Sequence, residues 1–382
     1  MAWASRAGKV VFVRTTSRKD AVRCARLMSQ HPRPAVSLLF ACALATVAAR
    51  DARAQGCSPS TAESTCFDAD TLAVPFAPGD FFAISRARAM APASWAVGVD
   101  LTALHRPVVL HAPSPDPHGR DIPVVGTLLD AAVAVAGSPA RHLELGAALP
   151  FSLYRTGTGL SGVTSQTGPE LSGPALRDVR VGAGYDIFRV RPGGGTAVTS
   201  GLVRLELSVP TGKSGSFAGE RSVVAEPTFD LDIEDGRFFA ALEERVRLRE
   251  PVTFGGDRLG TQWLSSLGVG YDALEHALLR VALEAHVAPY LSTRAHTLAD
   301  GTRVDPGTLV PAEWMLSVRT RFDAFSLGLG GGTAIPLSSE TRVAPGGTQT
   351  KETFAPVTTP EFRFALTLRY VLPGESSRHR AP

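Results

Sequence analysis

The chain has 382 residues, of which 44% are hydrophobic and 20% are charged, and its formal net charge at pH 7 is +3. This hydrophobic content excludes a disordered chain, and the small net charge argues against a nucleic-acid-binding protein, which concentrates basic residues on one face. We therefore expect one large or two ordinary folded domains and no nucleic-acid partner.

The first 54 residues have the pattern of an export signal. Ala35 to Ala49 is an unbroken run of small and apolar residues, Arg33 precedes it, and Ala52-Arg53-Ala54 follows. This order predicts an upstream extension and a signal peptide over residues 1–54, with the start at Met28 and cleavage after Ala54. One alternative is a transmembrane anchor, for which the apolar run is short. The other is a lipoprotein site at Cys42, which follows too short an apolar run.

Residues 55–93 precede the first predicted strand and hold the two cysteines that cleavage would leave, Cys57 and Cys66. An even pair in an exported protein predicts one disulfide that closes a small loop. The segment also contains Phe81-Phe82. Its composition leaves two interpretations open, which are a periplasmic segment and a plug inserted into the domain that follows.

From residue 94 to 371, apolar and polar residues alternate with a period of two, which is typical of strands between two different environments. For example, Val203, Leu205 and Leu207 alternate with Arg204 and Glu206. Soluble strands average about 5–6 residues, whereas a tilted membrane strand needs about 9–11, and most of these segments reach the longer figure. The twelve predicted strands are 94–104, 126–136, 142–154, 176–188, 197–210, 222–233, 237–249, 261–272, 276–290, 312–322, 324–337 and 360–371.

The connections between these strands alternate between long and short along the chain. An outer-membrane barrel has short periplasmic turns and longer external loops, and an even strand number places both ends of the barrel on the periplasmic side. The sequence thus predicts a twelve-stranded antiparallel transmembrane β-barrel over residues 94–371, in the outer membrane of a Gram-negative bacterium, followed by a C-terminal tail, 372–382. Outer-membrane lipid, lipopolysaccharide and the barrel-assembly machinery are its expected partners. The long connections are 105–125, 155–175, 211–221, 250–260, 291–311 and 338–359.

Because lipid cannot hydrogen-bond the backbone, the sheet must close, with its apolar face toward lipid and its polar face toward the lumen. The strand 237–249 fits least well, because Glu244 falls on its apolar face and suggests a slip in register. Aromatic residues near the strand ends are expected to form interfacial girdles. These residues are Trp95, Trp263, Tyr271, Tyr290, Trp314 and Tyr370.

The predicted inward face carries charges of both signs. One interpretation is a wet lumen whose charges select solutes, and the other is a plugged lumen whose charges pair with one another. We expect a pore or channel-like transporter for small solutes, with a non-conducting structural or adhesive barrel that binds through its external loops as the alternative. The charged candidates for lining the lumen are Arg180, Asp186, Arg204, Glu206, Asp230, Asp232, Arg280, Glu284, Arg319, Arg321, Arg363 and Arg369.

Motifs for catalysis are weak. Thr211-Gly212-Lys213-Ser214 resembles the end of a phosphate-binding loop but lacks the earlier glycine of that motif, so we interpret it as a turn that ends a strand. Asp116, His118 and Asp121 are expected to lie in a solvated loop. No convincing set of Ser, His and acid supports a barrel hydrolase, so we expect no enzyme, no cofactor and no metal. A secreted soluble β-sandwich is the remaining alternative.

Several stretches resemble the barrel portion of OmpA-type outer-membrane proteins from myxobacteria, over roughly residues 66–371. This resemblance implies an outer-membrane barrel without the peptidoglycan-binding domain that the family often carries. The stretches are Asp68-Ala69-Asp70-Thr71-Leu72, Arg106-Pro107-Val108-Val109-Leu110, Leu176 to Gly182, Leu207 to Gly212 and Phe217-Ala218-Gly219-Glu220.

Overall fold

The computed structural model describes residues 64–112, 120–162, 170–274, 278–298, 300–307, 309–354 and 358–373. The predicted signal region, Cys57, Asp116 and His118 lie outside these residues, as does the tail from residue 374. In the described ranges, no helix is long and apolar enough to cross a membrane.

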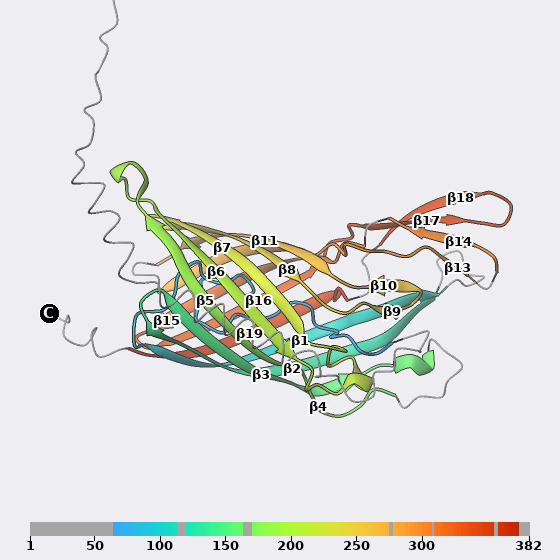
Figure 1. Ribbon diagram of the computed structural model, residues 1–382, viewed down its shortest axis with the longest axis horizontal. Coiled ribbons are helices and arrows are strands. Elements are labelled where there is room, and N and C mark those ends of the chain that lie inside the picture. Colours follow the sequence, from blue (N-terminus) through green and yellow to red (C-terminus); the bar gives the residue numbers. More distant parts are fainter. Residues whose placement is uncertain are drawn as a thin grey trace, which may run out of the picture. The chain divides into compact units, whose positions relative to one another are not determined.

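The described residues form a closed antiparallel barrel of twelve strands, as the alternation predicts (Figure 1). Each strand pairs with its neighbours along the chain, and the first and last strands pair from Trp95↔Leu372 to His105↔Phe362, which closes the barrel. The strands are β1 (Trp95–Ala112), β2 (Arg120–Ala140), β3 (Leu143–Thr156), β5 (Val179–Val190), β6 (Val198–Val209), β7 (Val224–Asp235), β8 (Phe238–Arg247), β11 (Gln262–Asp272), β12 (Leu279–Val287), β15 (Ala312–Phe322), β16 (Phe325–Ala334) and β19 (Phe362–Leu372).

One end of the barrel, here called the short-turn end, has tight turns. Two of these turns place Gly236 and Asp323 in the left-handed region, with φ of 61° and 48°. The other end, the long-loop end, carries further structure. β4 (Ala175–Leu176) pairs with β3, β9 (Val252–Phe254) pairs with β10 (Asp257–Leu259), and a separate four-stranded sheet extends from this end (Figure 1). Its strands are β13 (His296–Thr297), β14 (Arg303–Pro306), β17 (Ser338–Val343) and β18 (Gln349–Phe354).

The first long connection is shorter than predicted. β1 and β2 continue beyond the barrel wall as a hairpin, so much of the predicted loop 105–125 is strand. The reason is that Val108, Val124 and Val125 are at most 1% exposed and belong to a hydrophobic cluster that covers the long-loop end of the lumen. An apolar hairpin face packed on a core favours continued pairing over an open loop.

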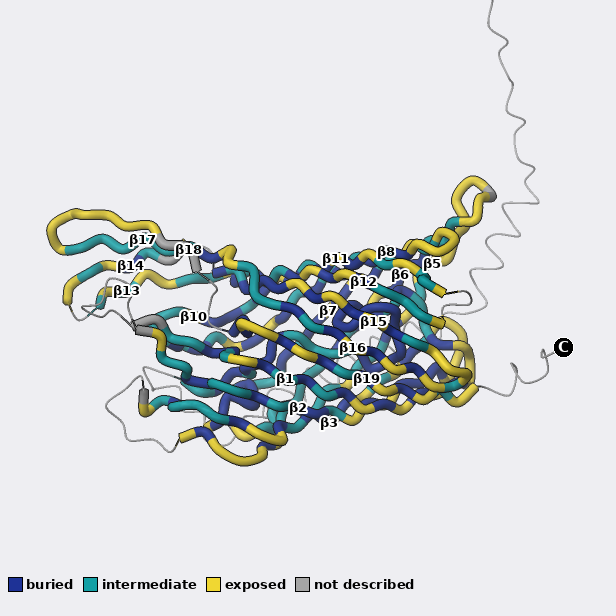
Figure 2. Tube along the Cα trace, turned by 180° about the vertical axis from the view of Figure 1, so that it is seen from behind, coloured by how far each residue is buried: buried dark blue, intermediate teal, exposed yellow. Residues whose placement is uncertain are grey.

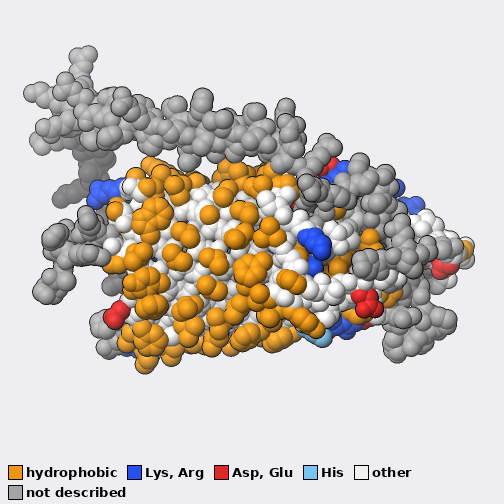
Figure 3. Space-filling view, turned by 90° about the horizontal axis from the view of Figure 1, so that it is seen from below, with side chains coloured by type: hydrophobic (Ala, Val, Ile, Leu, Met, Phe, Trp, Pro, Cys, Tyr) orange, Lys and Arg blue, Asp and Glu red, His pale blue; other side chains and the backbone are white. Residues whose placement is uncertain are grey.

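The exterior of the barrel wall is apolar, as Figure 3 shows for one face. Large hydrophobic side chains point outward on every strand of the wall, and the buried positions alternate with them (Figure 2). Aromatic pairs such as Phe238–Tyr271 and Phe325–Tyr370 lie at the short-turn end, with ring centroids 5.1 and 4.6 Å apart. Trp263 is exposed near the long-loop end. This distribution is that of a lipid-facing band with an aromatic girdle at each edge.

Two expectations about this outer surface are wrong. Tyr290 does not belong to a girdle, because it is 2% exposed and packs inside the long-loop cluster, where its hydroxyl lies 3.3 Å from Arg249 Nη2. The β8 register does not slip at Glu244. This carboxylate lies on the outer face and accepts hydrogen bonds of 2.7 Å from Trp263 Nε1 and Ser265 Oγ, so its polar atoms are satisfied near the aromatic girdle.

Candidate functional site

The lumen is occupied by residues 64–94, which we call the plug segment. At the long-loop end, the Ser64 amide donates to the Thr253 carbonyl at 2.8 Å. Near the short-turn end, the Ala89 amide donates to Asp186 Oδ1 at 2.5 Å, and β1 begins at Trp95 on that side. The plug segment therefore crosses the lumen from end to end, and of the two interpretations of residues 55–93, the described part has the geometry of a plug.

The plug segment has no helix or strand of its own, so its backbone N–H groups need other acceptors. Carboxylates of the barrel wall supply them. Glu284 accepts from the amides of Phe82 and Ala83 at 2.5 and 2.9 Å. Glu243 accepts from Ser85 at 2.9 Å, Asp232 from Ala87 at 2.6 Å and Glu144 from Met90 at 3.2 Å.

Guanidinium groups of the wall donate to the plug carbonyls in the same way. Arg319 donates to Gly79 O at 2.6 Å and to Phe81 O at 2.8 Å. Arg369, Arg180 and Arg247 donate to Pro75 O at 3.0 Å, Val74 O at 3.1 Å and Thr71 O at 2.8 Å. The charged side chains of the wall thus serve as hydrogen-bond partners for the backbone of the plug segment.

Aromatic side chains of the plug seal the middle and the short-turn half of the lumen. Phe76 is 2% exposed and packs on small residues of the wall, including Ala134 and Ala148. Opposite its ring stands Gly146, where an added Cβ would lie 2.5 Å from Phe76 Cδ2. Phe81 contacts Gly268 in the same manner. Glycine and alanine on the inner face therefore make the space that the plug rings fill.

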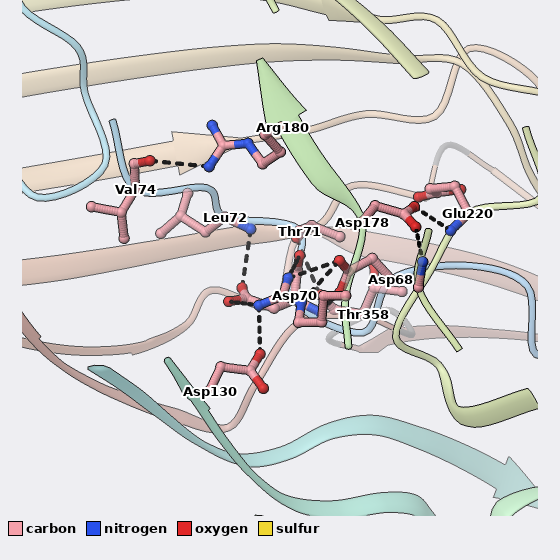
Figure 4. Close-up of polar contacts among 12 residues, drawn as sticks. Asp68, Asp70, Thr71, Leu72, Val74, Asp130, Asp178, Arg180, Glu220 and Thr358 are labelled. Carbon is pink, nitrogen blue, oxygen red and sulfur yellow. Dashed lines mark hydrogen bonds and ion pairs between the residues drawn. The ribbon is translucent and has the colours of Figure 1, made fainter. Parts of the chain in front are cut away.

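The long-loop half contains a pocket with about 770 Å³ of empty space, which we call the long-loop pocket. Plug residues 68–74 form one side, and β1, β2, β3 and the ends of β5 to β8 form the rest. Arg177 is one of its lining residues, with Nη1 2.5 Å from Asp130 Oδ2 and Nη2 2.8 Å from Asp68 Oδ2. Figure 4 shows these carboxylates converging from the plug and from the wall.

Asp178 lies at the rim of the pocket, just before β5. Its carboxylate accepts the amides of Gly212 at 2.8 Å and Glu220 at 2.7 Å, and thereby holds the loop that contains the predicted strand-ending turn (Figure 4). Burial raises the pKa of Asp178 to about 7, with a further increase from the nearby Asp68 and Glu220 carboxylates, although the two amide donors oppose this shift. Among the described residues, no guanidinium is ion-paired with Asp178.

A second pocket, with about 430 Å³ of empty space, is lined in part by plug residues 71–73. It contains His286, which is 6% exposed and whose Nε2 lies 3.6 Å from Glu284 Oε2. Among the described residues, neither ring nitrogen of His286 has a hydrogen-bond partner. The two pockets share Leu72 and Ala73 of the plug segment among their lining residues.

The twelve charged residues predicted to line the lumen stand at inward-facing positions, and most of them contact the plug segment or pair with one another. Arg321 faces the same way, opposite the buried Ser326, but is exposed because it lies at the short-turn end of β15. Pairs within the wall are Arg180–Glu206 (2.6 Å), Arg204–Asp230 (3.4 Å) and Arg363–Glu313 (2.9 Å), and pairs that involve the plug are Arg280–Asp80 and Arg363–Asp70 (2.9 Å).

The sequence interpretation did not single out Arg177, Asp68 and Asp70, which line the long-loop pocket. Arg177 stands at the start of a predicted strand, where alternation assigns no special role, and Asp68 and Asp70 lie in the segment whose position was left open. Their signal is a composition unusual for a linker, in which acidic residues and large aromatics occur together. Cys57 lies outside the described residues, so the Cys57–Cys66 disulfide stays a prediction.

No protein-family model and no curated protein matches the sequence. Among solved structures, the chain is similar to an outer membrane channel from Pseudomonas putida F1, with a TM-score of 0.52 and 12% identity over 78% of this chain and 99% of that one. The NanC porin gives 0.39 and 7% identity over 72% and 98%. The outer membrane protein OpdK from Pseudomonas aeruginosa gives 0.26 and 8% identity over 73% and 98%. At these identities the likeness concerns the fold.

The closed barrel and its lipid-facing exterior give the chain the fold of an outer-membrane β-barrel. This agrees with the expected localisation in the outer membrane of a Gram-negative bacterium. The resemblance to the myxobacterial OmpA-type barrels stays an expectation beyond this general outer-membrane class.

Proposed function

We propose that the chain is a gated passive channel for small solutes, closed in this structure by the plug segment, which must shift for a solute to pass. The observation that carries the proposal is the mode of attachment of the plug. Individual side chains of the wall, such as Glu284, Glu243 and Asp232, accept hydrogen bonds from its backbone amides, and no strand or helix anchors it to the wall.

The distribution of space in the lumen supports the same function. The two pockets lie in the long-loop half, which faces the outside in outer-membrane barrels, and the aromatic seal lies in the middle and the short-turn half. A solute that enters from outside would first have to pass the hydrophobic cluster that covers the long-loop end, and would then reach a polar pocket before it meets the aromatic seal. Movement of Phe76 and its neighbours would then connect this pocket to the periplasm.

A non-conducting structural or adhesive barrel remains the second candidate. Two observations favour it, which are the filled lumen and the four-stranded sheet β13-β14-β17-β18 at the long-loop end. Such a barrel would use the sheet as an external binding surface and would need no movement of the plug.

A reversible cross-link between plug and wall distinguishes the two functions. A Cβ added at Gly146 would lie 2.7 Å from Phe76 Cβ, so the plug must move about 1 Å away from β3 to reach the 3.5–4.5 Å separation of a disulfide, and the Phe76→Cys change removes the ring that a side chain at 146 would otherwise meet. We would reconstitute the Phe76→Cys/Gly146→Cys variant, from Gln55 onward, in planar bilayers and record single channels before and after reduction. The wild-type protein under the same reductant controls for effects on its own cysteines.

A gated channel predicts openings in the wild-type protein, none in the oxidised variant, and their return on reduction. Equal conductance of the oxidised and reduced variant would refute the plug as the gate. If the wild-type protein folds, as judged by heat-modifiable migration in gels, but never conducts, the structural barrel is the better description.

A further inference from the structure

We propose that the long-loop pocket binds small organic cations, namely solutes that carry a protonated amine. This inference rests on the proposed function, because it names the class of solute that a channel of this kind would admit.

The charge of the pocket lining is the first argument. Seven carboxylates and three guanidiniums line the pocket, namely Asp68, Asp70, Asp100, Asp130, Asp178, Glu220 and Glu226 with Arg177, Arg180 and Arg247. Several carboxylates also have arginine partners that do not line the pocket, such as Arg363 for Asp70 and Arg369 for Asp100. The lining that a solute meets therefore carries more carboxylates than guanidiniums.

The second argument is that Asp130 has an acceptor oxygen without a donor and that Asp178 has no cationic partner among the described residues. Asp130 is 3% exposed, and its Oδ1 has no hydrogen-bond partner among the described residues, while its Oδ2 pairs with Arg177. Asp178 receives two amide donors and no guanidinium. A buried oxygen without a donor is costly, and an ammonium group brings three N–H donors together with the opposite charge.

The guanidiniums of the pocket, in contrast, are already engaged. Arg177 pairs with Asp68 and Asp130, and Arg180 binds Glu206 and the Val74 carbonyl. Arg247 binds Glu226, Gln262 and the Thr71 carbonyl. An anion would have to displace these partners and would also face the remaining carboxylates.

The test measures binding and selectivity on the refolded chain from Gln55 onward. Equilibrium dialysis in detergent with cadaverine, a dication, and with glutarate, a dianion of the same chain length, compares the two signs of charge. We expect saturable binding of cadaverine and none of glutarate. Asp130→Asn removes one charge but leaves Arg177 its Asp68 partner, and it should weaken cadaverine binding about tenfold or more. Glu244→Gln, on the lipid-facing side of β8, is the matched control and should bind as the wild-type protein does.

Bilayer recording separates this inference from the proposed function. We expect a reversal potential in a KCl gradient that shows cation preference, and block of the current by cadaverine added on the long-loop side. Binding of cadaverine without any conductance would uphold the site and refute the channel. A conducting barrel that prefers anions, or that binds glutarate as well as cadaverine, would overturn the cation site and leave the channel standing.

Discussion

Replacement of Glu284 tests whether wall carboxylates hold the plug. Glu284 is fully buried, and its two oxygens accept the amides of Phe82 and Ala83 at 2.5 and 2.9 Å. Glu284→Ala leaves two buried N–H groups without acceptors, and each such group costs about 1–3 kcal/mol, so the attachment of the plug should weaken by about 2–6 kcal/mol. Glu284→Gln keeps one acceptor oxygen, so the attachment of the plug should weaken by about half as much as in Glu284→Ala.

Hydrogen–deuterium exchange measures this loss at the amides concerned. Because about 1.4 kcal/mol corresponds to a factor of ten, exchange at Phe82 and Ala83 should accelerate by about 30-fold to 10⁴-fold in Glu284→Ala. Amides in the β1–β19 ladder should keep their protection, since those pairs do not involve the plug. Glu244→Gln, which changes an outward carboxylate, is the control for general destabilisation. An acceleration below about threefold at Phe82 and Ala83 would refute the anchoring role.

Three further predictions concern the seal, the wall and the rim of the pocket. Gly146→Leu should push Phe76 out of its site and raise the open probability in bilayers, whereas Gly331→Leu on the lipid-facing side of β16 should not; equal behaviour would contradict the role of the seal. Gly332→Ala should abolish refolding to the heat-modifiable form, because the added Cβ would overlap the Trp314 carbonyl, and Gly331→Ala should refold normally because its nearest contact is at 3.5 Å. The pKa of Asp178 is about 7 in the folded state, against an ordinary 3.8, so the folded state binds this proton more tightly than the unfolded state does. The free energy of unfolding should therefore fall as the pH rises from about 4 to 7. Exchange of the Gly212 and Glu220 amides, corrected for the intrinsic rate, should show this trend, and Asp178→Asn should remove it.

The barrel could be predicted from the sequence because alternation is a local property. In β6, the alternation of Val203, Leu205 and Leu207 with polar residues identifies the lipid-facing side of the strand within five residues. No contact with a distant part of the sequence is needed for this inference. The alternation of short and long connections then gives the orientation of every strand. The same local rule placed most of the charged lumen candidates on the inner face.

The plug could not be decided in this way because its partners are far away in the sequence. The Phe82 amide and its acceptor Glu284 are 202 residues apart, and Arg319 and the Gly79 carbonyl are 240 apart. Residues 64–94 form no helix or strand, so their sequence has no periodicity from which these contacts could be predicted. Tyr290 was misplaced for a related reason. It stands at the end of a strand, as a girdle residue does, but the cluster that buries it is built from the plug and the long loops.

The direction in which the plug segment runs has a consequence for assembly. Its last residues join β1 at the short-turn end, while Ser64 lies at the opposite end, so the chain threads its own barrel. Once β1 has paired with β19 the barrel is closed, and the plug segment can no longer enter the lumen from the side. The segment must therefore be laid across the growing sheet before β1 and β19 meet, or be drawn through afterwards. Withdrawal of the plug segment toward the short-turn end would have to draw Ser64 along the entire lumen, so short sideways shifts of the segment within the barrel are the simpler way to open a path.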